Sequence, residues 1–176
     1  WSGLSLAVGV AVAASLHADI RLKWPNDLWW RERKLAGILL ETATARGDAG
    51  GEAARWVVMG IGINVRPPQL DQPVSTAPAS LHEIMGPIAA PTVLQRVALP
   101  LLRTVKRFEQ EGFAPFAAAF AQRDALAGRP LWLSDGTEGM GAGVDASGAL
   151  RVRTRARLQH ERSLQVSVRP KGPLAS

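Results

Sequence analysis

The sequence predicts an α/β (α+β) fold, in which a mixed β-sheet flanked by helices is followed by a small β-barrel. Three observations support this prediction. The 176 residues are 47% hydrophobic and 20% charged, as in ordinary folded domains. Helix and strand patterns intermingle as far as residue 126, and short strand patterns separated by turns fill the rest. We therefore expect two domains, 1–126 and 127–176.

The first helix is expected over residues 3–16, a run that is apolar on almost every side and longer than a typical strand. Ser2 stands immediately before this run and is its expected N-cap. Apolar and basic residues then alternate over 20–24, which predicts a strand. Pro25, with the polar pair that follows it, ends this strand in a turn.

Three further strands are expected in the first half of the chain. The charged turn 31–33 joins the first two of them, and a loop over 45–53 precedes the third. The expected strands span residues 28–30, 34–42 and 56–65. A proline-rich loop over 66–79 follows them.

The rest of the first domain is predicted to be helical. A short helix over 80–86 starts with a capping-box pattern, in which a serine is followed three residues later by a glutamate. A long helix over 91–111 carries apolar side chains at the helical period and has a proline in its first turn. Pro100 is expected to kink or split this helix. The last helix is expected over 113–124.

Short strands dominate the sequence after residue 126 and together favour a small barrel. Asp-Gly and Ser-Gly turns separate the first three of these strands. The strands are expected over 130–134, 139–144, 150–154 and 164–169.

The composition excludes several classes of site. Cysteine is absent, so there is no disulfide framework, thiolate zinc site or cysteine nucleophile. The histidines His17, His82 and His160 have no metal-ligand spacing. The longest apolar run, about 13 residues, is too short to span a bilayer, and we expect a cytoplasmic protein. Because the chain opens on Trp1, we expect it to be a piece of a longer protein.

The formal charge of +6 comes from the end of the chain. Residues 1–150 carry 14 basic and 14 acidic side chains, whereas 151–176 carry seven basic and one acidic. Four alternating arginines would share one face of a strand; these are Arg151, Arg153, Arg155 and Arg157. This arginine stripe is either a solvated strand face or a landing site for an acidic partner or nucleotide. No aromatic residue interleaves with it, which argues against a single-stranded nucleic-acid module.

The segment KWPNDL, residues 23–28, ends a strand in a turn that presents an amide and a carboxylate, Asn26 and Asp27. On spacing alone, this segment is either a plain hairpin turn or a functional corner. In the functional interpretation, Asp27 accepts a proton, holds Mg²⁺ or orients a neighbouring group.

The segment RKLAGIL, residues 33–39, places a single lysine at the start of an apolar strand. Lys34 is either a lysine whose stem packs along a strand end or an ammonium directed at an anion. In the second case, Gly37 would let a ligand approach the backbone closely.

The segment GIGIN, residues 60–64, contains two glycines within an apolar strand. It lacks the third glycine and the following helix of a dinucleotide-binding fingerprint, and the chain has no Walker A motif. We therefore assign no phosphate loop to it.

Taken together, KWPNDL, RKLAGIL and GIGINV resemble the catalytic domain of bacterial biotin protein ligases. The resemblance continues through FEQEGFAPF (108–116) and GRP (128–130) into the last strands, and so covers nearly the whole chain. It implies a biotin/lipoate ligase-like fold with an SH3-like C-terminal barrel. It also implies a reaction in two steps. Biotin attacks the α-phosphate of ATP to give biotinyl-5′-adenylate and pyrophosphate, and a lysine of a carrier protein then attacks this mixed anhydride.

The resemblance implies roles for particular residues. The expected catalytic residues are Lys34, whose ammonium would bridge the biotin carboxylate and the α-phosphate, and Asp27, which would act on the incoming amine or help to hold Mg²⁺. The biotin slot is expected to be formed by Lys34, Gly37, Ile38 and Leu39. The nucleotide contacts are expected from Trp24, Asn26, Asn64 and Arg169.

ATP, Mg²⁺ and biotin are the small molecules that the resemblance implies, and the biotin carboxyl carrier protein of acetyl-CoA carboxylase is the implied partner. A homodimer is a further option, and DNA binding would require an upstream repressor domain. The Gly/Arg-rich biotin-binding loop of the family is not present in this sequence. Two alternatives therefore stay open: a lipoate or octanoate ligase or transferase of the same architecture, and a catalytically impaired fragment that binds nucleotide or carrier.

Overall fold

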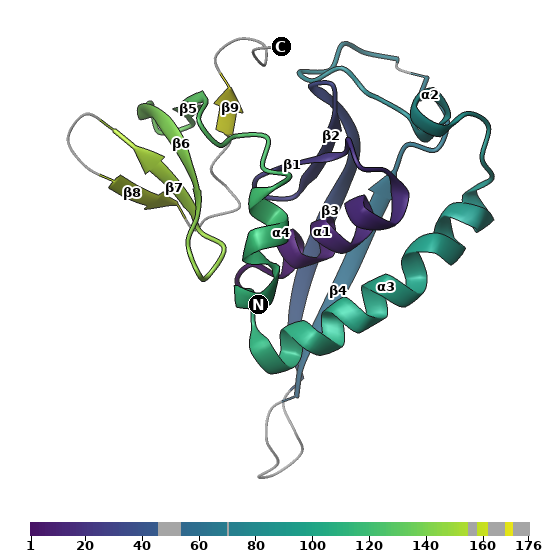
Figure 1. Ribbon diagram of the computed structural model, residues 1–176, viewed down its shortest axis with the longest axis horizontal. Coiled ribbons are helices and arrows are strands. Elements are labelled where there is room, and N and C mark those ends of the chain that lie inside the picture. The colour runs from purple at the N-terminus through teal and green to yellow at the C-terminus, as the bar shows by residue number, and fades with distance from the viewer. Residues whose placement is uncertain (46–53, 70, 155–157, 162–167, 171–176) are drawn as a thin grey trace.

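The computed structural model of the chain describes residues 1–45, 54–69, 71–154, 158–161 and 168–170. Two β-sheets and their helices make up the fold (Figure 1). The first sheet has the strand order β1 (Arg21–Lys23), β2 (Asp27–Trp30), β3 (Arg33–Ala45) and β4 (Ala54–Ile63). The second sheet has the order β8 (Leu158–Glu161), β7 (Leu150–Arg153), β6 (Glu138–Val144), β5 (Pro130–Leu133) and β9 (Val168–Pro170).

The first sheet is an antiparallel meander, and the expectation of a mixed sheet is wrong. Each strand pairs antiparallel with the next one along the chain. Parallel contacts within the described residues are isolated bridges, which join Leu22 to Asp124 and Lys34 to Pro78. A meander needs only short turns between neighbouring strands, and as a result Asp27 lies opposite Gly37 across the β2–β3 pair.

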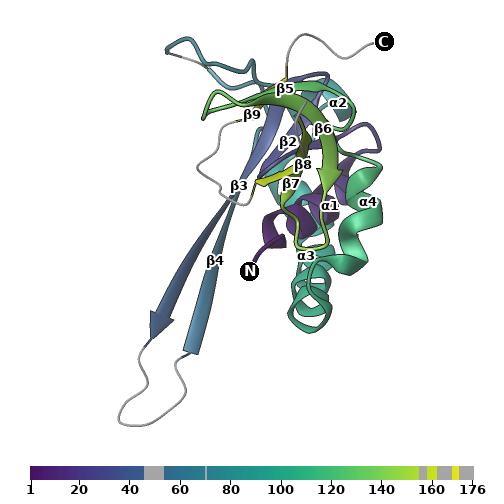
Figure 2. The ribbon, with the colours of Figure 1, turned by 90° about the vertical axis from the view of Figure 1, so that its left-hand side faces the viewer.

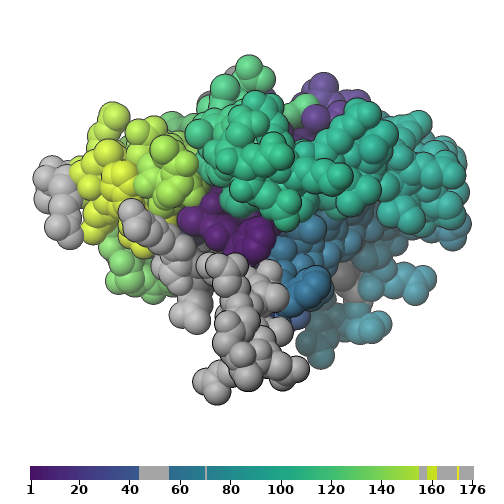
Figure 3. Space-filling view, turned by 90° about the horizontal axis from the view of Figure 1, so that it is seen from below, coloured from purple at the N-terminus to yellow at the C-terminus, as the bar shows by residue number. Residues whose placement is uncertain are grey.

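Helix α1 (Leu4–Leu16) packs between the first sheet and the helices α3 (Ala90–Glu111) and α4 (Ala117–Ala121). This position buries nearly all of the helix and explains why its sequence is apolar on almost every side. The expected N-cap is wrong, because Gly3 takes that place with a φ of 81°. The Ser2 hydroxyl donates instead to the Ser147 carbonyl oxygen at 3.0 Å. Figure 3 shows the purple start of the chain at the surface, next to a blue part of the chain.

Helix α3 runs without interruption past Pro100, so the expected split is wrong. A proline at this position removes the hydrogen bond that would reach the carbonyl of Arg96. Arg96 is exposed on the outer side of the helix, where water can replace the missing bond. The helix therefore tolerates the proline.

The other helices follow the expected pattern with shifted ends. Helix α2 (Leu81–Met85) begins after Ser80, and its capping box is confirmed by a bond from the Ser80 amide to the Glu83 carboxylate at 2.8 Å. The helix expected over 113–124 is shorter, because a 3₁₀ turn, η1 (Ala114–Phe116), leads into α4. Within the described residues, no helix is both long enough and apolar enough to span a bilayer.

The β3–β4 hairpin extends well beyond the rest of the molecule (Figure 2). Strand β3 is longer than expected and continues to Ala45, whereas β4 has the expected length but begins two residues earlier, at Ala54, and ends at Ile63. The loop expected over 45–53 lies, apart from Ala45, outside the described residues. Leu39, Trp56 and Val58 are exposed on this hairpin.

The second sheet is antiparallel throughout its described pairs, and strand β8 was not expected. Strands β8 and β9 are the two edge strands of this sheet, and no pairing between them is seen among the described residues. The expected barrel is therefore not confirmed. Residues 164–167 of the strand expected over 164–169 lie outside the described residues, and β9 begins at Val168. The domain division at 126/127 stays a prediction.

The turn after β6 joins the two sheets. The Trp24 indole Nε1 donates to the Gly148 carbonyl oxygen at 3.1 Å. Gly148 has a φ of 83°, and a Cβ atom there would lie 2.7 Å from the Gly3 Cα. Only glycine therefore allows this turn to approach the start of α1 so closely.

Asp145 organises the same turn. Its carboxylate accepts hydrogen bonds from the Ser147 hydroxyl at 2.6 Å and the Ala149 amide at 3.0 Å, and it contacts His160 Nδ1 at 3.0 Å. Burial by itself would raise the pKa of Asp145. The hydrogen bonds from Ser147, His160 and the backbone outweigh burial and hold this pKa well below its ordinary value.

Replacing Asp145 with alanine is expected to lower the free energy of unfolding by about 1–2 kcal/mol at pH 7, because it leaves these donors without their acceptor. Because the pKa of Asp145 is lowered in the folded state, its charge contributes fully to the free energy of unfolding above the ordinary aspartate pKa of ~4. This contribution is lost as the pH falls below that value. Urea unfolding of both proteins at pH 7 and pH 3 measures the difference, which we expect to shrink at pH 3. An equal difference at both pH values would show that the charge is not responsible.

Candidate active site

A cleft of about 1000 Å³ lies against the first sheet and is lined by residues of β2, β3 and β4 and of the 66–79 loop. Side chains alternate across a strand, and Leu28 and Ile38 point toward Gly9 of α1 on the opposite face. Asp27, Trp29 and Gly37 line the cleft on the other face. Pro170 of β9 also lines it, so the second sheet contributes to one wall. We call this hollow the sheet cleft.

Lys34 and Asp27 form an ion pair in the sheet cleft, with the Lys34 Nζ 2.7 Å from the Asp27 Oδ1. The Lys34 side chain is 45% exposed and the Asp27 side chain 16%, so the ammonium remains open to a ligand. A Cβ atom on Gly37 would lie 3.4 Å from the Lys34 Nζ and 3.6 Å from the Asp27 Oδ1. The pair therefore rests directly on the backbone at Gly37, and a larger side chain there would push into it.

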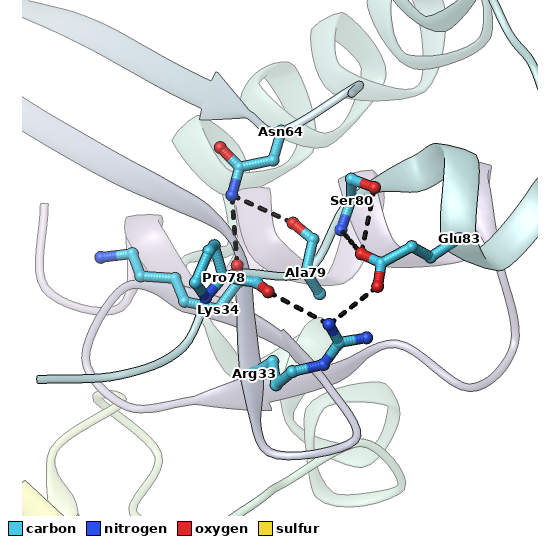
Figure 4. Close-up of polar contacts among 7 residues, drawn as sticks. All are labelled: Arg33, Lys34, Asn64, Pro78, Ala79, Ser80 and Glu83. Carbon is cyan, nitrogen blue, oxygen red and sulfur yellow. Dashed lines mark hydrogen bonds and ion pairs between the residues drawn. The ribbon is translucent and has the colours of Figure 1, made fainter. Parts of the chain in front are cut away.

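Asn64 fixes the start of β3 to the end of the 66–79 loop (Figure 4). Its Nδ2 donates to the carbonyl oxygens of Lys34 at 3.2 Å and Ala79 at 3.1 Å. The backbone adds two bonds beside it, from the Lys34 amide to the Ala77 carbonyl and from the Ala79 amide to the Lys34 carbonyl, both at 2.8 Å. Asn64 also lines the sheet cleft, where its Oδ1 could accept a bond from a ligand.

Arg33 holds the other side of this loop end, away from the Lys34 ammonium (Figure 4). Its Nη1 donates to the Glu83 Oε1 at 2.8 Å and to the Pro78 carbonyl at 3.3 Å. This guanidinium, more than any other group, holds the pKa of Glu83 below its ordinary value. Because Glu83 also caps α2, helix, loop and strand are fixed together at the edge of the cleft.

Sequence reasoning missed Lys23 and Trp29. Both line the sheet cleft, with the Lys23 Nζ 5.3 Å from the centre of the Trp29 ring, a contact that a cation and an aromatic face favour. Trp29 is 6% exposed, and its Nε1 is buried without a hydrogen-bond partner. The signal was available for Lys23, because this lysine lies inside KWPNDL and is one of only four in the chain.

Two of the expected nucleotide contacts are instead engaged within the fold. The Asn26 Nδ2 donates to the Ile38 carbonyl at 2.8 Å, and the Ile38 amide donates back to the Asn26 carbonyl at 2.9 Å. Trp24 is 3% exposed and donates to Gly148. Neither residue lines the sheet cleft. Arg169 lies in β9 opposite Trp132, next to the cleft residue Pro170.

The expected biotin residues divide between the two faces of β3. Gly37 and Lys34 line the sheet cleft. Ile38 is 2% exposed and faces the core, and Leu39 is 59% exposed and lies outside the cleft. The described residues contain no group of three histidine, cysteine, aspartate or glutamate side chains that could hold a metal ion.

No protein-family model matches the chain. Among curated proteins, the chain is 35% identical over 156 residues to the bifunctional ligase/repressor BirA of Escherichia coli (strain K12), a match that covers 84% of this chain and 47% of BirA. It is 32% identical over 159 residues to the biotin–[acetyl-CoA-carboxylase] ligase of Paracoccus denitrificans, with 86% and 64% covered. The solved structure of biotin protein ligase from Aquifex aeolicus in complex with biotin and ATP matches with a TM-score of 0.80 and 24% identity, covering 97% of this chain and 72% of that one.

The fold of this chain is therefore that of the biotin protein ligases. The sequence matches relate the chain to bacterial biotin protein ligases, and the resemblance of its three motifs to that family is confirmed. The chain spans about half the length of the BirA proteins it matches, 47% in each. Its activity, substrates and partners are accordingly proposals.

Proposed function

We propose that the chain is the catalytic and C-terminal part of an enzyme that attaches biotin to a lysine of a carrier protein in an ATP-dependent reaction. The observation that carries this proposal is the Lys34–Asp27 ion pair in the sheet cleft. A partly exposed ammonium that rests on a glycine backbone is suited to binding an anion. The name of the Paracoccus relative and the Aquifex complex with biotin and ATP support the same reaction.

In the first step, an oxygen of the biotin carboxylate attacks the α-phosphorus of ATP. The bond between the α-phosphorus and the bridging oxygen breaks, and pyrophosphate leaves with the electron pair. Two anions must approach each other for this reaction, so a cation between them lowers the barrier. We assign the contact with both anions to Lys34, and Lys23 supplies a second positive charge to the same cleft.

In the second step, the amine of a carrier lysine attacks the acyl carbon of biotinyl-5′-adenylate, and AMP leaves. The amine must lose a proton to become nucleophilic. Asp27 is the carboxylate nearest to the Lys34 ammonium, and we assign the proton acceptance to it.

For the ligands, we place biotin along the backbone at Gly37, with Ile38 forming the layer beneath and Leu39 the outer margin. We place the nucleotide near Asn64 and β9, with Arg169 on that strand, and the corner built by Trp24 and Asn26 supports this site from below. Mg²⁺ keeps several waters and binds through few carboxylates and substrate phosphates. Asp27, a carboxylate of the cleft, suits an ion that arrives with ATP.

The proposed partner is the biotin carboxyl carrier protein of acetyl-CoA carboxylase, in line with the name of the Paracoccus relative. A homodimer, DNA binding through an upstream repressor domain and a cytoplasmic location remain predictions from the resemblance. We also keep the division into domains 1–126 and 127–176, with an SH3-like barrel as the second.

Transfer assays with apo carrier domains test this function. Labelled biotin, lipoate or octanoate is offered with ATP and Mg²⁺, and we expect label on the carrier lysine with biotin alone. Transfer of lipoate or octanoate would instead support the related acyl ligases. Binding of nucleotide or carrier without any transfer would support the catalytically impaired fragment.

The arginine stripe has no part in this mechanism. Arg151 and Arg153 lie on one face of β7, opposite the buried Leu150 and Val152, and neither lines the sheet cleft; Arg155 and Arg157 lie outside the described residues. Replacing all four with glutamine is expected to leave the rate of adenylate formation within about threefold of the unmodified chain, because Arg151 and Arg153 do not line the cleft and salt screens charges that do not contact the reacting groups. Pyrophosphate release measures this rate. A collapse of the rate would show that the stripe belongs to the ATP site.

A further inference from the structure

The turn between β2 and β3 has an uncommon backbone conformation two residues before Lys34. Its central residues, Arg31 and Glu32, have φ values of 48° and 63°. Both values lie in the left-handed region, which side chains other than glycine seldom adopt. Hairpin turns of this kind usually carry Asn-Gly or Gly-Gly. Such a turn persists where contacts around it fix its conformation.

The contacts around this turn come from two directions. The guanidinium groups of Arg31 and Arg33 lie over the Trp30 ring, 4.5 Å and 5.3 Å from its centre. The Glu32 Oε1 accepts a hydrogen bond from the Arg129 Nη1 at 2.7 Å. The Arg129 side chain is 8% exposed and the Glu32 side chain 29%, so this ion pair is largely removed from water. Removing one partner would leave the other charge poorly solvated.

Arg129 is hydrogen-bonded to the second sheet. It directly precedes β5, and its carbonyl accepts a hydrogen bond from the Gly141 amide of β6 at 2.8 Å. Two residues further along the chain, Leu131 of β5 pairs with Pro170 of β9. Pro170 and Glu32 both line the sheet cleft. The pair therefore connects the turn before Lys34 to the sheet that supplies a wall of the cleft.

We propose that Glu32 and Arg129 are a positioning pair, which holds the second sheet against the β2–β3 turn and thereby sets the distance between Lys34 and the β9 wall. Because the sheet cleft is the proposed site of ATP, the pair would govern how ATP is bound; this part rests on the proposed function. The two residues act through Lys34 and β9, and neither is a catalytic residue.

Amide hydrogen exchange of the ligand-free chain tests the structural part. We expect Glu32→Gln and Arg129→Ala to speed exchange at residues 31–34 and in β5 by roughly tenfold or more, since local opening becomes easier there. Arg107→Ala is the matched control, because its ion pair with Glu111 on α3 is exposed and remote from the cleft. If Glu32→Gln left the exchange rates unchanged, the proposal would be overturned. The test can be made with this variant alone if Arg129→Ala does not fold.

Steady-state kinetics test the consequence for ATP at a temperature where each variant is folded. We expect Glu32→Gln and Arg129→Ala to raise the KM for ATP by roughly tenfold with a smaller change in kcat, and Arg129→Lys to recover part of the loss. The double variant should be no worse than the poorer single one, since both remove the same contact. A lowered melting temperature with an unchanged KM would show a purely structural role and overturn the positioning role. If the unmodified chain makes no adenylate while exchange changes as expected, the proposed function fails and the pair stands.

Discussion

Replacing Lys34 with alanine is expected to lower the rate of adenylate formation by about 10²–10³-fold. The Lys34 ammonium lies in the sheet cleft with nearly half of its side chain exposed, so it can contact both the biotin carboxylate and the α-phosphate. Without this ammonium, the negative charges of the two reactants are less well neutralised as further charge develops in the transition state. Pyrophosphate release at saturating biotin and ATP measures this step.

Lys106→Ala is the control for this prediction, because Lys106 is exposed on α3 and does not line the cleft. Thermal unfolding should show that both variants remain folded. A Lys34→Ala rate within a few-fold of the unmodified chain would remove Lys34 from its catalytic role and leave it as a surface lysine paired to Asp27.

Replacing Asp27 with asparagine is expected to lower the transfer of biotin from preformed adenylate to a carrier lysine by about 10²–10⁴-fold, the usual contribution of a general base. Asparagine keeps the shape of the side chain and removes the charge that accepts the proton. It also releases the Lys34 ammonium, which lies 2.7 Å from the Asp27 carboxylate, so adenylate formation should fall as well, though less than in Lys34→Ala.

Single-turnover transfer with purified biotinyl-5′-adenylate separates the two steps, since it bypasses the reaction with ATP. Asp19→Asn serves as the matched control, because the Asp19 side chain is 74% exposed and does not line the sheet cleft. If Asp27→Asn transferred preformed adenylate at the normal rate but formed it slowly, Asp27 would act only by orienting Lys34.

Local patterns were sufficient to predict the elements that build the site. The all-apolar run over 3–16 predicts a helix enclosed by other elements, as α1 is. The serine and glutamate spacing at 80–83 predicts the capping box, and Pro25 predicts the turn that ends the strand after Lys23. The pairing of Asp27 with Lys34 follows from the hairpin between β2 and β3, since a meander places these positions near each other.

Contacts between distant parts of the chain could not be predicted from local patterns. Lys34 pairs with Pro78 through isolated backbone bonds, and Glu32 meets Arg129 across 97 positions of sequence. No local pattern marks either contact, because each depends on how the sheets pack. The apolar period of α3 does mark its exposed side, but it does not show that the carbonyl freed by Pro100 lies on that side, and the expected split of the helix was therefore wrong.

The expected biotin residues can be divided between the two faces of their strand from sequence. Successive residues of a strand point to opposite faces, so Ile38 is expected to point away from the face on which Gly37 lies. The structure places Ile38 in the core and Gly37 in the cleft. The contact of these residues with biotin stays a prediction from the resemblance.

The Lys34–Asp27 site is proposed to join the biotin carboxylate to the α-phosphate of ATP. Product analysis by mass spectrometry, after incubation of the chain with biotin, ATP and Mg²⁺ but without a carrier, tests this reaction. We expect biotinyl-5′-adenylate and pyrophosphate in equal amounts, and neither product when biotin is omitted. Formation of ADP and phosphate, or ATP left intact in the presence of biotin, would contradict the claim.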